Sequence, residues 1–228
     1  MLELSKLPAK NIAMLVVLVL SLQSTIALAR DGQHAPILKQ QVDSIEAAVP
    51  TGWEIHASTL GDLNGDGRPD CMLVLAREAD TSSDDGSVFA LYLARKAGGY
   101  DLAVVTRSPI SLDGTKVSST VRKKIYSLTK IYMIGGAEVT ETYRFRFQNQ
   151  QLYLAGTDYT ARHQGYYVFE SLNYLTGELR FRSNYEDKDH LGWVKGRFTP
   201  RLLTPQEISE AGDDLISHEL CARDKSLC

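Results

Sequence analysis

Short strand patterns, separated by tight turns, follow one another along most of this chain and limit the folds that it can adopt. The clearest pattern is residues 143–148, in which aromatic and polar residues alternate strictly. Such alternation predicts a strand with one buried face and one face in water. Turn sequences such as Gly98–Gly99 and Asn149–Gln150 separate neighbouring patterns and are typical of hairpins. No helical pattern lies between the strands, so parallel crossover units are not expected.

The complete set of patterns predicts a mainly β protein. The predicted strands are residues 53–57, 72–76, 88–95, 100–105, 130–134, 143–148, 151–156, 166–174 and 179–182. Successive strands with short turns favour an antiparallel meander that forms a curved sheet or a two-layer sandwich. Apolar residues within 36–49 recur at three- and four-residue spacing, which predicts a short N-terminal helix. Thr204, Pro205 and Glu207 have the signature of a helix start and predict a short C-terminal helix to about residue 219.

Residues 1–29 have the three parts of a secretory signal. Lys6 and Lys10 supply positive charge, residues 12–20 are apolar but short for a membrane span, and Ala27–Ala29 has the A-x-A form of a cleavage site. We therefore expect a periplasmic or secreted protein with no membrane span in its mature form. The expected organisation is a signal peptide at 1–29, a calcium-loop β domain at 30–203 and a helical tail at 204–228.

Charge and cysteine content narrow the function classes. The chain has a formal net charge of −3, and removal of the signal, which carries a net +1, leaves −3 − 1 = −4. This mildly acidic balance gives no reason to expect nucleic acid as a partner. Cys221 and Cys228 lie close together, and in an oxidising compartment they predict a local disulfide. Cys71 begins an apolar strand and is expected to be a small buried hydrophobe, although pairing with a tail cysteine stays open.

The loop at residues 61–70 places oxygen donors at alternate positions of a glycine-containing turn. Its side-chain donors are Asp62, Asn64, Asp66 and Asp70, at loop positions one, three, five and nine. The backbone carbonyl of Arg68, at position seven, adds another oxygen. Three carboxylates and an amide favour a hard cation, and calcium tolerates irregular geometry better than magnesium. A plain turn with solvated acids is the alternative, because Asn-Gly and Asp-Gly are strong turn formers.

The loop differs from an EF-hand and resembles another family. Position twelve is Leu73 where an EF-hand has a bidentate glutamate, and the flanks are strands. With the apolar run 72–75, the loop resembles the calcium loop of FG-GAP and VCBS-type repeats. More narrowly, it is similar to small exported bacterial proteins with a single such loop, in which an aromatic-alternating strand like 143–147 and a turn like 173–177 follow. The resemblance implies no activity, and it implies calcium ligands at Asp62, Asn64, Asp66 and Asp70.

Two pairs of arginines form a second candidate site. Arg144 and Arg146 lie on one face of a strand, and Arg180 and Arg182 lie on one face of another. If the strands are neighbours, these residues form a basic patch for an anionic ligand or an acidic partner. A solvated sheet face is the alternative.

Catalytic motifs are scarce, which favours a binding role. The histidines show no zinc-binding spacing, and no G-x-S-x-G sequence is present. The first hypothesis is a non-enzymatic exported protein, stabilised by calcium, that presents a sheet face or loops to a protein or envelope partner. One version is an immunity or inhibitor protein that masks a toxin in the same compartment. The second hypothesis is a cell-envelope hydrolase that uses surface-loop carboxylates such as Asp187 or Asp189, with His190 nearby.

Overall fold

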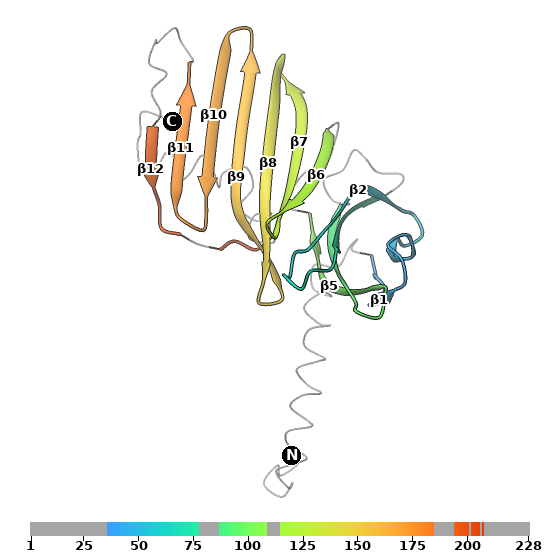
Figure 1. Ribbon diagram of the computed structural model, residues 1–228. Coiled ribbons are helices and arrows are strands. Elements are labelled where there is room, and N and C mark those ends of the chain that lie inside the picture. The colour runs from blue at the N-terminus through green and yellow to red at the C-terminus, as the bar shows by residue number, and fades with distance from the viewer. Residues whose placement is uncertain are drawn as a thin grey trace, which may run out of the picture. The chain divides into compact units, whose positions relative to one another are not determined.

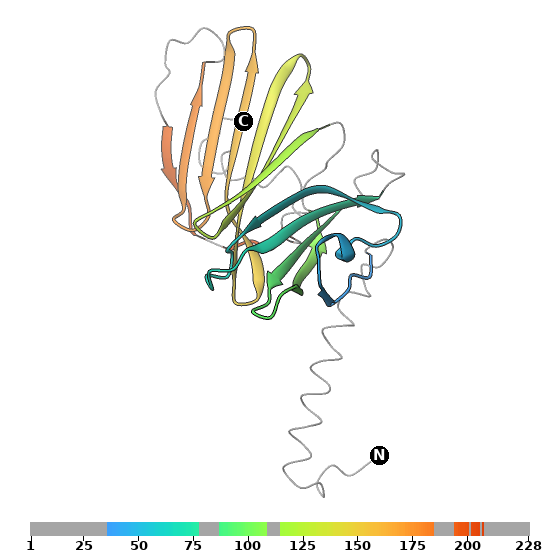
Figure 2. The ribbon, with the colours of Figure 1, turned by 45° about the vertical axis from the view of Figure 1, so that its right-hand side comes forward.

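The computed structural model describes residues 36–77, 87–108, 115–184, 194–200, 202–205 and 207. These residues form two antiparallel sheets (Figures 1 and 2). The five-stranded sheet has the order β1 (Gln41–Val42), β5 (Tyr100–Arg107), β4 (Val88–Ala94), β3 (Asp70–Arg77) and β2 (Trp53–Gly61). The seven-stranded sheet has the order β12 (Val194–Arg197), β11 (Glu178–Ser183), β10 (Tyr166–Asn173), β9 (Gln151–His163), β8 (Ala137–Gln148), β7 (Ile125–Ile134) and β6 (Lys116–Arg122). The mainly β, antiparallel fold class is confirmed.

Two-residue turns set the register of the seven-stranded sheet. Lys123 and Lys124 join β6 to β7 with φ values of 52° and 63°, and Asn149 and Gln150 join β8 to β9 with φ values of 50° and 60°. Turns with two positive φ values match the right-handed twist of antiparallel strands. The turn predicted at residues 149–150 is therefore confirmed.

The main core lies between the two sheets. The five-stranded sheet contributes Phe89 and Leu91, and the seven-stranded sheet contributes Tyr126 and Phe145, all of which are 0% exposed. Phe89 meets Phe145 edge-on, with ring centroids 5.5 Å apart, a favoured geometry for buried aromatic pairs. The aromatic stripe predicted on one face of 143–148 is thus a core face.

The predicted N-terminal helix is wrong. Residues 36–40 are irregular, β1 follows, and a single 3-10 turn, η2, spans Glu46–Ala48. Val42 pairs with Tyr100 in β5, and the backbone N–H of Leu102 donates to the carbonyl of Gln40 (2.8 Å). The apolar residues Leu38, Val42 and Ala48 cover the far face of the five-stranded sheet. Tertiary strand pairing therefore overrides a weak helical periodicity.

Several other predictions fall at or beyond the limits of the described residues. The N–H of Thr204 donates to the carboxylate of Glu207 (2.6 Å), and the N–H of Glu207 donates to the Thr204 hydroxyl (3.3 Å). These are the two bonds of the predicted capping box. The rest of the C-terminal helix, the Cys221–Cys228 disulfide and the signal peptide lie outside the described residues. Within them, Cys71 is a free, buried cysteine, and no helix is long and apolar enough to cross a membrane.

Candidate functional site

The aspartate-rich loop joins β2 to β3 and folds around the carboxylate of Asp62. This carboxylate accepts hydrogen bonds from the backbone N–H groups of Gly65 (2.5 Å), Asp66 (3.1 Å) and Gly67 (3.1 Å). Gly65 and Gly67 have φ values of 89° and 82°, a region that residues with a Cβ rarely adopt. The two glycines therefore permit the tight turn, including the sharp bend expected at Gly67.

Asp70 begins β3 and is 0% exposed. Its Oδ2 accepts the N–H groups of Leu63 (2.9 Å) and Asn64 (3.1 Å), and its Oδ1 accepts the N–H of Ala94 (3.0 Å). Hydrogen bonds of this kind replace the water that a buried carboxylate loses. Both oxygens of Asp70 therefore face backbone N–H groups, and the side chain ties the loop to the end of β4.

Asn64, Asp66 and Arg68 form the exposed side of the loop. The Asn64 amide donates to Asp66 Oδ2 (2.9 Å), and the Arg68 guanidinium donates to the same carboxylate. Arg68 Nε also donates to the carbonyl of Ala94 (2.9 Å). The backbone N–H of Arg68 donates to Asp66 Oδ1 (2.9 Å), and this bond is the main cause that lowers the pKa of Asp66. Asp66 is thus held as a carboxylate by the chain's own donors.

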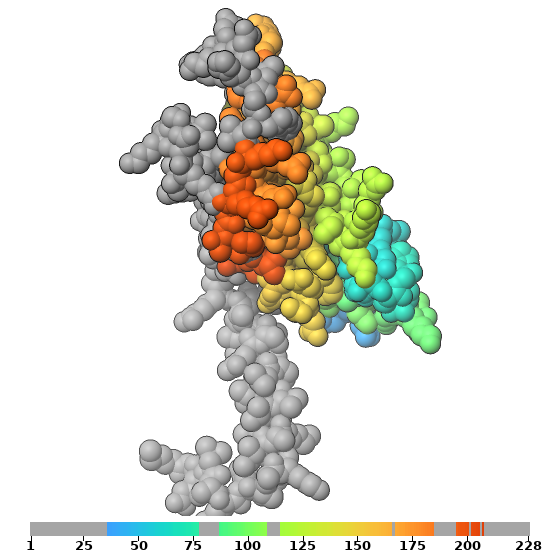
Figure 3. Space-filling view, turned by 60° about the vertical axis from the view of Figure 1, so that its left-hand side comes forward, coloured from blue at the N-terminus to red at the C-terminus, as the bar shows by residue number. Residues whose placement is uncertain are grey.

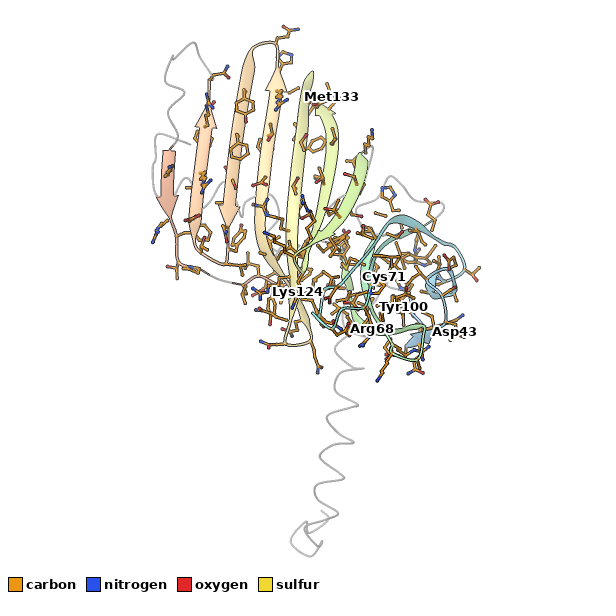
Figure 4. The ribbon with its side chains drawn as sticks, viewed as in Figure 1. Asp43, Arg68, Cys71, Tyr100, Lys124 and Met133 are labelled. Carbon is orange, nitrogen blue, oxygen red and sulfur yellow. The ribbon has the colours of Figure 1, made fainter. Side chains whose placement is uncertain are left out.

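The loop suits a hard cation in donor type but does not form a ready-made cage. Its donors are all oxygens, as calcium prefers. Besides Arg68, Lys124 places a positive charge next to the loop (Figure 4). Its Nζ is so close to Gly65 that a Cβ built on this glycine would lie 2.1 Å from it. Among the residues that the structure describes, no three acidic, histidine or cysteine side chains are grouped to hold a metal ion. Calcium binding therefore stays a prediction.

The second candidate site is a face of the seven-stranded sheet. Tyr126, Leu128, Phe145 and Leu172 mark its inner face, because all belong to the main core. Cross-strand register places alternate residues on the opposite face, which we call the outer face. Its charged residues are the basic Lys116, Arg122, Arg144, Arg146, Arg162, Arg180, Arg182, Lys195 and Arg197, and the acidic Glu138, Asp158 and Glu178.

The outer face is strongly basic although the chain is acidic. Nine basic and three acidic side chains leave a surplus of six positive charges on the described strands, whereas the whole chain has a net charge of −3. The sequence is therefore polarised, with one sheet face positive and the remainder negative. Such separation creates a local potential that net charge does not reveal.

Some of these charges are paired and others are not. Arg144 binds Asp158 through both of its terminal nitrogens, and Arg180 Nη2 lies 3.8 Å from Glu178 Oε2. Lys195 lies directly opposite Arg180 in the register. In the described part of the chain, five cations of the outer face take part in no ion pair or hydrogen bond: Lys116, Arg122, Arg146, Lys195 and Arg197.

The predicted arginine patch is partly corrected. Arg144 and Arg146 lie on β8, and Arg180 and Arg182 lie on β11, but β9 and β10 separate the two strands. The strands are not neighbours, so the four residues do not form one compact patch. They nevertheless share the outer face, because the antiparallel register keeps them in phase.

A shallow hollow continues the outer face at the ends of the β7–β8 and β9–β10 hairpins. Its volume is about 500 Å³, and Glu138, Arg162 and Tyr167, which pair across β8, β9 and β10, line it. The Arg162 guanidinium lies 5.6 Å from the centre of the Tyr167 ring. Met133, also in the lining, is 66% exposed and lies at the opposite end of the seven-stranded sheet from Lys124 (Figure 4).

Sequence reasoning missed most of the outer face. It singled out four arginines and left out the basic residues on β6, β9 and β12. The signal was present as alternation, since Lys195 and Arg197 have the same two-residue spacing as Arg180 and Arg182. Asp187, Asp189 and His190, the acids and histidine of the hydrolase hypothesis, lie outside the described residues.

Comparison with known proteins adds no relative. No family model, curated protein or solved structure matches the chain. The site must therefore be interpreted from its own geometry and charge.

Proposed function

We propose that this protein is an exported, calcium-stabilised, non-enzymatic binding protein of the cell envelope, and that its outer face holds an acidic partner. The observation that carries the proposal is the surplus of six positive charges on the outer face of an otherwise acidic chain. A protein that inhibits or masks another, such as an immunity protein, is one specific form of this function.

The charge arrangement supports binding because it is unfavourable for the isolated protein. Arg180 and Lys195 lie opposite each other on β11 and β12, and like charges at such positions destabilise a sheet. An acidic partner would relieve this repulsion and would also be attracted from a distance. In the described part of the chain β12 is an edge strand of the seven-stranded sheet, and it faces the viewer in Figure 3.

The calcium part of the proposal rests on the donor set of the loop and on its resemblance to FG-GAP and VCBS-type loops. The side-chain oxygens of Asp62, Asn64 and Asp66 and the carbonyl of Arg68 would hold the ion, with Asp70 as a further ligand or as the buried support. Calcium would offset the negative charge of the turn. Arg68 now donates to Asp66, so calcium has to compete with its guanidinium.

Enzymatic function has less support. The hydrolase alternative depends on Asp187 and Asp189, which lie outside the described residues.

Export depends on the signal at residues 1–29, and protein from the periplasmic fraction should begin at Arg30. An intact N-terminus in that fraction would contradict the proposed cleavage.

The binding proposal is tested by chemical cross-linking in an envelope extract. The double variant Arg180→Gln/Lys195→Gln removes two outer-face charges. Its matched control, Lys39→Gln/Lys96→Gln, removes two charges from exposed positions next to strands of the five-stranded sheet: Lys39 precedes β1, and Lys96 lies between β4 and β5. Wild type and control should capture the same acidic partner, and the outer-face variant should lose most of it. Equal capture by all three proteins would refute a role for the outer face.

The calcium proposal is tested by thermal unfolding of wild type, Asp66→Ala and Arg68→Ala, each with calcium and with a chelator. Calcium should raise the midpoint of wild type and have little effect on Asp66→Ala. It should have the largest effect on Arg68→Ala, in which the competing guanidinium is absent. Midpoints that do not respond to calcium in any of the three proteins would rule out the site.

A further inference from the structure

The composition of the outer face indicates which kind of acidic partner it fits. Protein partners usually meet around a buried apolar centre with aromatic anchors. The large exposed hydrophobic residues here are at one end of the face: Met133 lies on it opposite Glu138, and Ile134 is next to Met133 near the tip of the β7–β8 hairpin. Within the face, Ile131 and Phe169 are only half-exposed. The described outer face therefore lacks the apolar centre of a typical protein–protein interface.

Hydroxyl groups and guanidinium groups dominate the face instead. Seven of its nine basic residues are arginines, whose planar fork binds phosphate with two parallel hydrogen bonds. Hydroxyl side chains lie between them, in a cross-strand row that contains Ser118, Thr129, Thr142 and Ser171, with Asp158, the partner of Arg144, between the last two. Thr129 and Thr142 are hydrogen bonded to each other (2.9 Å). Guanidinium and hydroxyl donors together suit a ligand rich in anionic oxygens.

The spread of the cations argues for a long ligand. They lie on β6, β8, β9, β11 and β12, so they extend across the whole seven-stranded sheet. Six spacings of about 4.8 Å between strands give a width of about 29 Å. A single small anion would reach two or three of these groups. A chain with regularly spaced negative charges would reach most of them.

The described outer face offers no open aromatic ring for base stacking, the contact that would favour nucleic acid. Proteins that bind single strands stack bases on open aromatic rings. Tyr167 is half-buried and faces the guanidinium of Arg162, and Phe169 is half-buried on the neighbouring row. Tyr153, opposite Arg146, is also half-buried, and its hydroxyl donates to Gln151 (2.5 Å). None of the three rings is an open platform.

We propose that the outer face binds a linear phosphate-bearing polymer without bases. The proposal rests on the proposed function, since it names the chemistry of the acidic partner. The Arg180–Lys195 pair and Arg197 form the densest part of the contact, at the β12 edge of the described sheet. Arg122 and Arg146, which flank Ile125 in one cross-strand row, form a second part.

The test uses inorganic polyphosphate as the probe, with polyglutamate and a single-stranded oligonucleotide of equal charge as competitors. Binding to the purified protein is measured by fluorescence anisotropy over a range of salt concentrations. Polyphosphate should bind most tightly. Arg180→Gln/Lys195→Gln should weaken its binding about tenfold or more and flatten the salt dependence, since each lost phosphate contact lowers the slope by roughly 0.7 to 0.9. Lys39→Gln/Lys96→Gln should bind like wild type.

The outcomes separate this proposal from the one on which it rests. Tighter binding of polyglutamate would overturn the phosphate polymer and leave an acidic protein partner in place. Tighter binding of the oligonucleotide would overturn the exclusion of bases. Equal weakening in both double variants would show non-specific attraction and would overturn the site. No binding of any polymer would overturn the polymer proposal, whereas the cross-linking experiment would still decide the proposed function.

Discussion

Glu170 is a buried acid on the inner face of the sheet, and its replacement by glutamine tests the packing there. It is 6% exposed, and its Oε1 has no hydrogen-bond partner among the residues that the structure describes. Its cross-strand neighbours are Tyr159 on β9 and Phe181 on β11. The nearest described carboxylate on the same cross-strand row, Glu141, is already bound by Lys130 (3.0 Å). Burial therefore raises the pKa of Glu170 from 4.5 to about 7.

This pKa shift has a definite sign for stability. Between pH 4.5 and 7 the folded protein keeps a proton on Glu170 that the unfolded chain releases. The folded state binds more protons, so stability falls as pH rises through this window and is constant above it. At about 1.4 kcal/mol for each pH unit, the loss amounts to about 3 kcal/mol by pH 8. Glutamine has the same shape and no charge, so Glu170→Gln removes this loss.

Urea unfolding at pH 5 and pH 8, followed by circular dichroism, measures the effect. Glu170→Gln should be close to wild type at pH 5 and more stable than wild type by about 3 kcal/mol at pH 8. Glu54→Gln, at an exposed position on β2, is the matched control and should show no such difference. If Glu170→Gln gains no stability over wild type between pH 5 and pH 8, the buried and unpaired state of Glu170 is refuted.

Three further predictions follow from other residues. Asp70→Ala should lower the free energy of urea unfolding by about 2–4 kcal/mol, because three backbone N–H groups lose their acceptor, and an unchanged value would contradict the role of Asp70. Burial raises the pKa of Cys71 to about 12, so in a Cys221→Ser/Cys228→Ser variant a thiol reagent should react at pH 8 only on unfolding, and fast labelling of folded protein would refute this. Mass spectrometry of exported protein should find Arg30 at the N-terminus.

Many strand positions were predictable because local signals and tertiary packing agree, although β6 and β12 were not predicted. Turn residues bracket the strands, and the alternation in residues 143–148 matches the burial of Phe145 against the partly buried Tyr143 and Phe147. The pattern of residues 88–94 likewise places Phe89 and Leu91 in the main core. In these segments a period of two is set by the pleat alone, so no knowledge of distant partners is needed.

Bulges and distant pairing were not predictable. At β2 the register shifts between Ile55 and Ala57, so His56 is an extra residue and the faces exchange. Trp53 consequently packs in the cluster on the far side of the sheet, while Ala57 packs in the main core. The helix prediction for residues 36–49 failed for a related reason. Its conformation depends on pairing with β5, some sixty residues away, and local periodicity carries no information about that partner.

The two candidate sites differ in how much of each could be predicted from the sequence. The aspartate loop is local, so its residue types and spacing already define a donor set. The charged residues of the outer face come from five of the seven strands, and their clustering becomes visible only when strand order and register are known. Arg144 and Arg180 could be assigned to strand faces from sequence, but not to the same face.

The loop residues divide into two groups that physical reasoning separates. Asp70 is buried, and both of its carboxylate oxygens accept hydrogen bonds from backbone N–H groups. It therefore holds the turn to β4 with or without a cation. Asp66 is exposed, and its partners Asn64 and Arg68 belong to the same turn. A cation can replace these partners without disturbing the core. Calcium would therefore stiffen the exposed half of the loop, whereas the buried half depends on Asp70. The variants Asp66→Ala and Asp70→Ala should consequently differ in how their stability responds to a chelator.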